Sequence, residues 1–368
     1  MPAPARICVA SCFTSAMQSA GGFSAARRQR MATMANLIEA CLEALGARKV
    51  DGKWLGTNEG GDAGQCAPLA HFALYKIVGE DAEAFLQGQL SNDVRQLDGA
   101  RAQYTTYSNA KGRMLANMLL WRDGDGFYMM LAADLAEQVV RRLRMFVMRS
   151  RVNFQALDTL PLLLDEPGAE RLSTALGLVM PADPMQQAGV DGVAVIRLPH
   201  AGVLVVATEG DGRLLSSALE NSKIGVAGCN WADARFVASG FAWIVQATQE
   251  AFVPQMANME LLGAVNFRKG CYPGQEIVAR MQYLGKTKRR LFRVYSAAAL
   301  APGMALQCVD SPETEIGQVA YAAELPDQGC EALVVVMVSA WEKGIICASV
   351  DSALTRLQLP YEIPDLEN

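Results

Sequence analysis

Histidine is scarce in this chain of 368 residues, which contains only His71 and His200. Its nine cysteines include no Cys-x-x-Cys pair and no Cys/His cluster with metal-ligand spacing. We therefore expect no zinc site and no cysteine-ligated iron–sulfur cluster held by this chain alone. The odd number and irregular spacing of the cysteines argue against a disulfide scaffold and favour free thiols in a reducing compartment.

Long apolar runs are also missing, since no stretch approaches the roughly 18 residues that a membrane span needs. Hydrophobic residues make up 51% of the chain and charged residues 19%. This composition is typical of a globular protein, and the length suffices for two or three domains. We expect no membrane partner.

Positive charge is concentrated in one segment of an otherwise acidic chain. Residues 266–295 contain eight Lys/Arg and one acid, whereas residues 310–368 contain eleven acids and two bases. The net charge of the whole chain is −5. A basic island in an acidic protein indicates a local anionic ligand rather than general nucleic-acid affinity, and a solvated basic loop is the alternative.

Residues 1–65 are predicted to be a leader, a helix over Ala35–Leu45 and a loop over Gly46–Gln65, in part disordered. The first 35 residues have four arginines, many Ala and Ser and no acid, as a transit peptide would. The alternatives are a disordered leader or a start codon assigned too early, because Met31 and Met34 both precede the helix.

The rest of the chain predicts an α+β fold. Residues 66–288 alternate short strands with helices, for example a helix over Asp81–Leu90 and a strand over Gln103–Ser108. Residues 289–368 carry short β-like runs separated by Pro, Gly and acidic turns, which are typical of a small antiparallel β-barrel.

A further helix is predicted to begin at Asp134, a good N-cap residue. Its apolar face carries Leu135, Val139, Leu143 and Phe146. The opposite face carries Arg141, Arg142 and Arg144, and we interpret it as a solvated helix surface.

The most informative segment is Phe267–Arg280, which reads FRKGCYPGQEIVAR. Gly270 and Gly274 allow positive φ angles and close backbone approach, and the Pro-Gly pair suits a type II turn. A helix is predicted over Gln275–Gln282, with Glu276 in its first turn, where a carboxylate is favoured. Plain turn geometry is the alternative role of the two glycines.

This segment carries the groups of a small-molecule site. Gln275 and Glu276 match the donor and acceptor edge of a flat heterocycle. Lys269, Arg280 or Lys286 can meet carboxylates at the far end of such a ligand. Taken alone, the loop predicts a binding site and not its ligand.

Cys271 lies between a lysine and a helix N-terminus. Both neighbours favour the thiolate if the side chain is accessible. The alternative is a small buried apolar residue.

Four segments together resemble the YgfZ folate-binding family of the glycine-cleavage T-protein superfamily. The octapeptide KGCYPGQE at 269–276 is similar to that family's motif, and the similarity continues through Arg280 and over 285–289. FLQGQLSNDV at 85–94, NAKGR at 109–113 and FVPQMAN at 252–258 resemble the family's other motifs, in the family's order.

The resemblance implies a three-domain, clover-like fold that closes with the β-barrel, and it implies tetrahydrofolate or a derivative as the ligand. Residues 66–288 would form two intertwined α+β domains that bind the folate. The implied contacts are Lys269, Gly270, Tyr272, Gly274, Gln275, Glu276, Arg280, Asn92 and Asp93, with Cys271 as the catalytic thiol. On the bare sequence, a turn or cap residue is the alternative for Asp93.

The resemblance also implies a role in iron–sulfur cluster assembly or repair, with links to tRNA modification. The expected partners are then reduced folate and iron–sulfur enzymes or their assembly proteins. A bacterial-type sequence of this kind is expected in the cytoplasm, or in the mitochondrial matrix if residues 1–35 are a transit peptide.

The sequence departs from catalytic T-proteins, which transfer an aminomethyl group to tetrahydrofolate. An aspartate pair of those enzymes corresponds to Ala116 and Asn117 here, which removes a carboxylate suited to acid–base catalysis. A glutamate that helps to hold the pterin corresponds to Ala238. We therefore expect an accessory protein rather than an enzyme, with an aminomethyltransferase as the alternative.

A third hypothesis is an RNA-binding factor. The cations Lys286, Lys288, Arg289 and Arg290 are close enough in sequence to contact phosphates. No aromatic-interleaved RNA motif accompanies them, so direct nucleic-acid binding is not the expected function.

Overall fold

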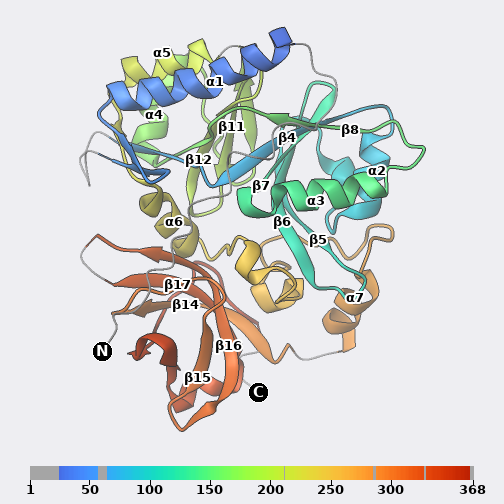
Figure 1. Cartoon of the computed structure of the whole chain (residues 1–368). Helices are drawn as coiled ribbons and strands as arrows, with labels where there is room; N and C mark the ends of the chain where they lie inside the picture. Colours follow the sequence, from blue (N-terminus) through green and yellow to red (C-terminus); the bar gives the residue numbers. More distant parts are fainter. Residues whose placement is uncertain (1–24, 57–63, 211, 285–286, 327–328, 365–368) are drawn as a thin grey trace.

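The computed structural model describes residues 25–56, 64–210, 212–284, 287–326 and 329–364. Within these ranges the chain builds three large sheets, with helices placed between and around them (Figure 1). The predicted α+β class is confirmed. Residues 1–24 of the predicted leader and Lys286 lie outside the described residues.

The first α+β unit contains a five-stranded antiparallel sheet with the order β5-β6-β7-β4-β8. Its strands are β4 (Phe72–Val78), β5 (Ala102–Ser108), β6 (Met114–Asp123), β7 (Gly126–Ala132) and β8 (Asn153–Leu157). Its helices are α2 (Ala82–Gln89) and α3 (Ala133–Met145). Helix α3 buries Leu135, Val139 and Leu143, as its sequence pattern predicts.

Two predictions for α3 are wrong. Asp134 lies inside the first turn, and its Oδ2 accepts a hydrogen bond from the Gln246 amide at 2.8 Å instead of capping the helix. Phe146 is 47% exposed rather than buried, because the helix ends at Met145 and its apolar periodicity ends with it.

The second α+β unit contains a six-stranded sheet with the order β10-β11-β12-β9-β3-β13. Its strands are β3 (Gln65–Pro68), β9 (Leu162–Leu164), β10 (Gln187–Val190), β11 (Val193–Leu198), β12 (Gly202–Ala207) and β13 (Gly225–Val226). Three helices, α1 (Ala25–Ala44), α4 (Glu166–Leu176) and α5 (Arg213–Ser222), belong to this unit (Figure 1).

The chain passes through the two sheets in an interleaved order. Strand β3 belongs to the second sheet, β4 to β8 build the first sheet, and β9 returns to pair with β3. Much later, β13 adds to the other side of β3 in parallel, with Gly225 opposite Gln65. The first sheet is therefore one continuous stretch of sequence, inserted between the strands of the second sheet.

The C-terminal part is an antiparallel β-barrel, as predicted. Its sheet has the order β19-β18-β15-β16-β17-β14-β20. The strands are β14 (Arg289–Ser296), β15 (Ala305–Cys308), β16 (Ser311–Glu324), β17 (Cys330–Met337), β18 (Ile345–Cys347), β19 (Ser352–Ala353) and β20 (Thr355–Leu357). Opposite ends of the sheet meet where Ser296 Oγ lies 2.9 Å from Ser352 Oγ.

The predicted loop over Gly46–Gln65 is only partly correct. A hairpin of β1 (Arg48–Val50) and β2 (Lys53–Leu55) occupies its first half, and β3 begins at Gln65. The hairpin turns at Asp51 and Gly52, whose φ angles are 49° and 79°, as a type I′ turn requires. Residues 57–63 of the predicted loop lie outside the described part of the chain.

A polar junction joins the α+β region to the barrel. Asp233 of helix α6 (Cys229–Ala238) lies 3.0 Å from Nε2 of His71, and its Oδ1 accepts a hydrogen bond from the Tyr321 hydroxyl of β16 at 2.5 Å. Burial opposes a charge on His71, but the Asp233 carboxylate outweighs it and raises the pKa of His71 to about 9. The Asp233 carboxylate of α6 therefore contacts both the turn before β4 and strand β16.

This junction predicts a pH-dependent stability. Below the ordinary histidine pKa of about 6.5, His71 is protonated in both folded and unfolded chains, and its contribution is complete. Between that pH and about 9, only the folded chain keeps the proton, so the contribution is lost as pH rises. Because solvent reaches the 35%-exposed side chain, we expect a loss of only about 1 kcal/mol.

Urea unfolding at pH 6 and pH 9.5 measures this effect. The parent should lose about 1 kcal/mol more than His71→Gln over that interval. Equal losses in the two proteins would contradict the assigned role of the His71–Asp233 pair.

Candidate functional site

The loop at residues 263–269 is hydrogen-bonded to the segment that follows α2. Ser91 Oγ donates to the Ala264 carbonyl at 2.7 Å, although 173 residues separate them. Asn92 Nδ2 donates to the Gly263 carbonyl at 2.7 Å and to the Tyr104 carbonyl of β5 at 2.8 Å. The fold thus brings the 85–94 segment against residues 263–264, which lie shortly before the 267–280 segment in the sequence.

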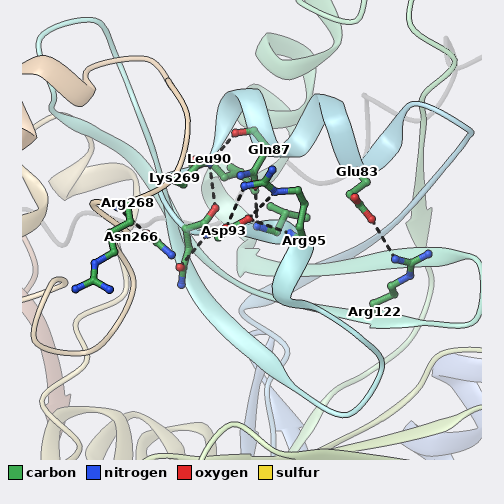
Figure 2. Close-up of polar contacts among 11 residues, drawn as sticks. Glu83, Gln87, Leu90, Asp93, Arg95, Arg122, Asn266, Arg268 and Lys269 are labelled. Atoms are coloured by element: carbon green, nitrogen blue, oxygen red, sulfur yellow. Dashed lines mark hydrogen bonds and ion pairs between the residues drawn. The ribbon is translucent and has the colours of Figure 1, made fainter.

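Lys269 clamps this contact from the loop side. Its Nζ donates to the carbonyls of Gln87, Leu90 and Asn92 at 2.6, 2.5 and 3.0 Å, at the C-terminal end of α2 (Figure 2). These carbonyls include ones that a helix end leaves without intrahelical partners. Burial lowers the pKa of Lys269 to about 8. Since an ammonium has three donors, Lys269 has none left for a ligand carboxylate.

Gly274 joins the loop to a second segment. Its φ is +81°, and a Cβ atom there would lie 2.4 Å from the Asn109 carbonyl oxygen and 2.7 Å from the Gly112 Cα. Gly112 has a φ of +73° and faces Ile277 and the Gly274 carbonyl in return. The two glycines let the 109–113 and 269–276 segments touch through their backbones.

Gly270 and Tyr272 have different surroundings. Gly270 is exposed, and a Cβ atom there would have open space around it, so close approach is not its role. Tyr272 is buried, and its hydroxyl has no partner among the described residues. Burial raises the pKa of Tyr272 to about 12. The Lys269 ammonium lies 5.3 Å from the centre of the Tyr272 ring.

The predicted helix is present as α7 (Gln275–Leu284). Its Val278 is buried, and the Val278 carbonyl accepts from Gln255 Nε2 of η3 (Pro254–Ala257) at 2.7 Å. Gln275 is half-buried, with Nε2 at 3.5 Å from the Lys269 carbonyl.

The remaining predicted side chains of this segment face outward. Cys271, Glu276 and Arg280 are all exposed. The structure therefore separates the loop into a packed half, which includes Lys269 and Tyr272, and an exposed half.

Asp93 is neutralised by a neighbour. Both of its carboxylate oxygens accept from the Arg95 guanidinium, at 3.1 and 3.2 Å (Figure 2). The hydrogen bond from Arg95 lowers the pKa of Asp93. Asp93 also caps the short helix η1 (Val94–Gln96) by accepting from the Arg95 amide. This geometry matches the cap residue that the bare sequence offers as the alternative.

A cavity of about 220 Å³ opens beside Asn92. It is lined by Asn92, Gln96, Leu97, Arg101, Ala102, Gln103, Tyr104, Met185, Leu262 and Gly263. Gln103 Nε2 and Tyr104 Oη are buried polar atoms without a partner among the described residues. The two residues are neighbours on β5, so their side chains point to opposite faces. The Tyr104 ring stacks on Phe241 in the core, which leaves the Gln103 amide as the unpartnered group on the cavity side. Such atoms are costly unless something binds them.

Sequence reasoning missed most of this cavity. Of the predicted contacts, Asn92 is the one that lines the cavity. The 269–276 segment does not line it and reaches Asn92 only through the hydrogen bond from Lys269 to the Asn92 carbonyl. Gln103 and Tyr104 look like ordinary residues of a predicted strand. No feature of the sequence distinguishes them, because their lack of partners follows from the packing of distant segments.

No family model matches the chain. The tRNA-modifying protein YgfZ of Escherichia coli strain SMS-3-5 is 30% identical over 310 residues, which cover 81% of this chain and 93% of that protein. The protein of the same name from E. coli O157:H7 strain EC4115 matches with the same identity and coverage. The chain belongs to the YgfZ family.

The fold of this YgfZ-family protein is that of a glycine-cleavage T-protein. The crystal structure of aminomethyltransferase T from Bartonella henselae superposes with a TM-score of 0.66 at 19% identity, over 81% of this chain and 86% of that one. The predicted three-domain T-protein fold is thereby confirmed. At this identity the similarity concerns the fold and not the activity.

Two of the positions where the sequence of this YgfZ-family chain is expected to depart from T-proteins are part of its core. Ala116 and Asn117 are buried in β6. Asn117 Nδ2 donates to the Ala242 carbonyl at 2.8 Å, and its Oδ1 accepts from the Ile244 amide at 2.8 Å. Both the nitrogen and the oxygen of the Asn117 amide are therefore hydrogen-bonded, and they hold residues 242–244 against β6.

In the described part of this YgfZ-family protein, no group of three or more His, Cys, Asp or Glu side chains is arranged to hold a metal ion. Among the same residues, no helix is long and apolar enough to cross a membrane.

Proposed function

We propose that the chain is a tetrahydrofolate-binding accessory protein that acts in the assembly or repair of iron–sulfur enzymes, through which it affects tRNA modification. The family membership supports this role, since the relatives are named as tRNA-modifying proteins. The observation that supports the ligand is the cavity beside Asn92, which the unpartnered Gln103 amide lines.

The groups around the cavity fit a pterin ring. A pterin offers several ring donors and acceptors in one plane, and an amide side chain such as that of Gln103 can pair with such an edge. The volume of about 220 Å³ is below the ~300–1,000 Å³ of sites that enclose a drug-sized ligand. The cavity would therefore take one ring system and leave the rest of the folate outside.

The glutamyl end of a folate carries carboxylates. Arg101 lines the same cavity and is exposed, so it is placed to pair with them. Arg280 of α7 is a second exposed cation, and we assign it the same role of pairing with the glutamyl carboxylates. Lys269 is assigned instead to holding the loop in place.

Cys271 remains the proposed reactive group. Its thiol is exposed and lies two residues from the buried Lys269 clamp, so a firmly held loop presents it to solvent. In this proposal the thiol acts on a protein partner, while the folate binds without it.

Calorimetric titration with tetrahydrofolate under reducing conditions tests the proposal. Gln103→Met keeps most of the side-chain length but removes the amide, and it is expected to weaken affinity about tenfold, the equivalent of one hydrogen bond of ~1.4 kcal/mol. Gln358→Met, at an exposed glutamine of the barrel, is the matched control and should bind as the parent does. Cys271→Ser should also keep the parent affinity but lose function in cells.

Two results would change this assignment. A parent protein that gives no heat of binding contradicts folate binding altogether. A loss in Glu276→Gln that matches or exceeds the loss in Gln103→Met would place the pterin over α7, as the sequence alone suggests, and not in the cavity beside Asn92.

A further inference from the structure

We propose that the C-terminal end of α3 and the turn after it, residues 141–151, form a docking surface for a protein partner that presents carboxylates around an apolar pocket. We call these residues the α3 patch. The inference concerns a part of the molecule that the folate proposal does not use.

The centre of the α3 patch is apolar and exposed. Met145 is 65% exposed, Phe146 47% and Met148 88%. Ten large hydrophobic side chains are exposed in the described part of the chain, and these three lie within four consecutive residues. Clustered apolar exposure of this kind is typical of an interaction site, whereas single exposed residues are not.

The backbone at Met148 supports the same interpretation. Its φ is +45°, in the left-handed region that non-glycine residues rarely adopt. A strained residue usually gains burial or hydrogen bonds in return, but this side chain points almost entirely into solvent. A hydrogen bond from the Ser150 amide to the Val147 carbonyl at 2.8 Å closes the turn around Met148, so this strained backbone holds an exposed apolar side chain in a defined place, as at many binding sites.

The rim of the α3 patch is positively charged. Residues 138–151 contain five arginines, no lysine and no acid, in a chain whose net charge is −5. Arg141, Arg142, Arg144 and Arg149 are exposed. Methionine, aromatic residues and arginine are the types enriched at protein–protein interfaces, and arginine pairs with carboxylates in a bidentate manner. The charge therefore selects an acidic partner.

Several of these arginines already have partners within the chain. Arg141 pairs with Glu137 at 2.6 Å, and Arg144 donates to the Phe154 carbonyl at 2.7 Å. Arg151 pairs with Glu80 at 2.5 Å. The apolar centre distinguishes the two kinds of partner, because a nucleic acid offers no apolar pocket for two methionines. The observations favour a protein over an RNA.

The α3 patch belongs to the first α+β unit, and helix α3 lies away from the barrel (Figure 1).

Fluorescence anisotropy with defined probes tests the proposal on the full chain. The first probe is a labelled amphipathic peptide of Glu, Leu and Phe, and the second is the same peptide with Lys in place of Glu. Unmodified tRNA and phosphatidylglycerol vesicles are the third and fourth. The variants are Met145→Ser/Met148→Ser and Arg149→Glu, with Val179→Ser as the control because Val179 is 86% exposed elsewhere.

We expect the acidic peptide to bind the parent at least tenfold more tightly than the lysine peptide. The double methionine variant and Arg149→Glu should each weaken acidic-peptide binding at least tenfold, while Val179→Ser leaves it unchanged. Urea midpoints equal to that of the parent will show that the variants fold.

Three outcomes overturn the proposal. They are equal binding of the acidic and lysine peptides, parent-like peptide binding by the methionine variant, and no peptide binding at all. If instead tRNA or vesicles bind the parent and Arg149→Glu abolishes this, the patch belongs to that ligand class and the protein partner is wrong.

Discussion

Replacing Gly274 by alanine is expected to lower the free energy of unfolding by about 3–4 kcal/mol, the sum of left-handed strain and overpacking. The new Cβ would lie 2.4 Å from the Asn109 carbonyl oxygen and 2.8 Å from the Gly112 amide nitrogen. Both are backbone atoms, which cannot rotate aside as the end of a side chain can. The 109–113 and 269–276 segments must then separate.

Urea unfolding of Gly274→Ala and of Gly52→Ala separates the two contributions. Gly52 has a φ of +79°, close to the +81° of Gly274, but a Cβ atom there meets no atom within 4 Å. Gly52→Ala should therefore cost only the strain, about 1 kcal/mol. Similar losses in the two variants would show that the contact with Gly112 is unimportant.

Replacing Lys269 by methionine is expected to destabilise the protein by about 3 kcal/mol, because buried carbonyl groups lose their donors. Methionine keeps much of the apolar stem of lysine but cannot donate to the carbonyls of Gln87, Leu90 and Asn92. The loop that contacts Asn92 would then lose its clamp, and the cavity beside it would change shape.

The matched control is Lys111→Met, because Lys111 is exposed in the 109–113 segment. An exposed lysine of this kind should change stability by no more than about 0.5 kcal/mol. Hydrogen exchange provides a second measurement, since the amides around Ser91 and Asn92 should lose protection in Lys269→Met alone. Unchanged protection there would contradict the clamp.

The sequence predicts much of the local structure correctly because local signals are strong. The helix after Pro273-Gly274 begins at Gln275, as its turn residues and apolar spacing predict. Gly274 has the positive φ that the Pro-Gly pair indicates. The hairpin at Asp51-Gly52 was also predictable in principle, since Asp-Gly between apolar residues is a strong hairpin signal, but the surrounding glycines favoured a loop.

Helix α4 was not predicted from the sequence, although it has clear signals at both ends. Asp165 caps it by accepting from the Gly168 amide at 2.8 Å, proline occupies its first turn, and Gly177 ends it with a φ of 63°. These are standard start and stop signals. These signals alone do not predict a helix here, because few large apolar residues lie between them to give a helical pattern.

The candidate site was less predictable, because it depends on contacts between distant segments. Chemistry alone makes Lys269 a ligand for carboxylates, and only the fold shows that the carbonyls at the end of α2 occupy it. In the same way, Gln103 and Tyr104 become notable only when tertiary packing leaves their polar atoms unpaired.

The interleaved path of the chain has a consequence for synthesis on the ribosome. Strand β3 pairs with β9 on one side and with β13, which starts at Gly225, on the other, and both partners are synthesised later. The edge of β3 that faces β13 stays unpaired until about 160 further residues have emerged, because its partner Gly225 lies opposite Gln65, and open strand edges on a nascent chain invite aggregation. Pauses in translation before that point should therefore make this protein unusually dependent on chaperones.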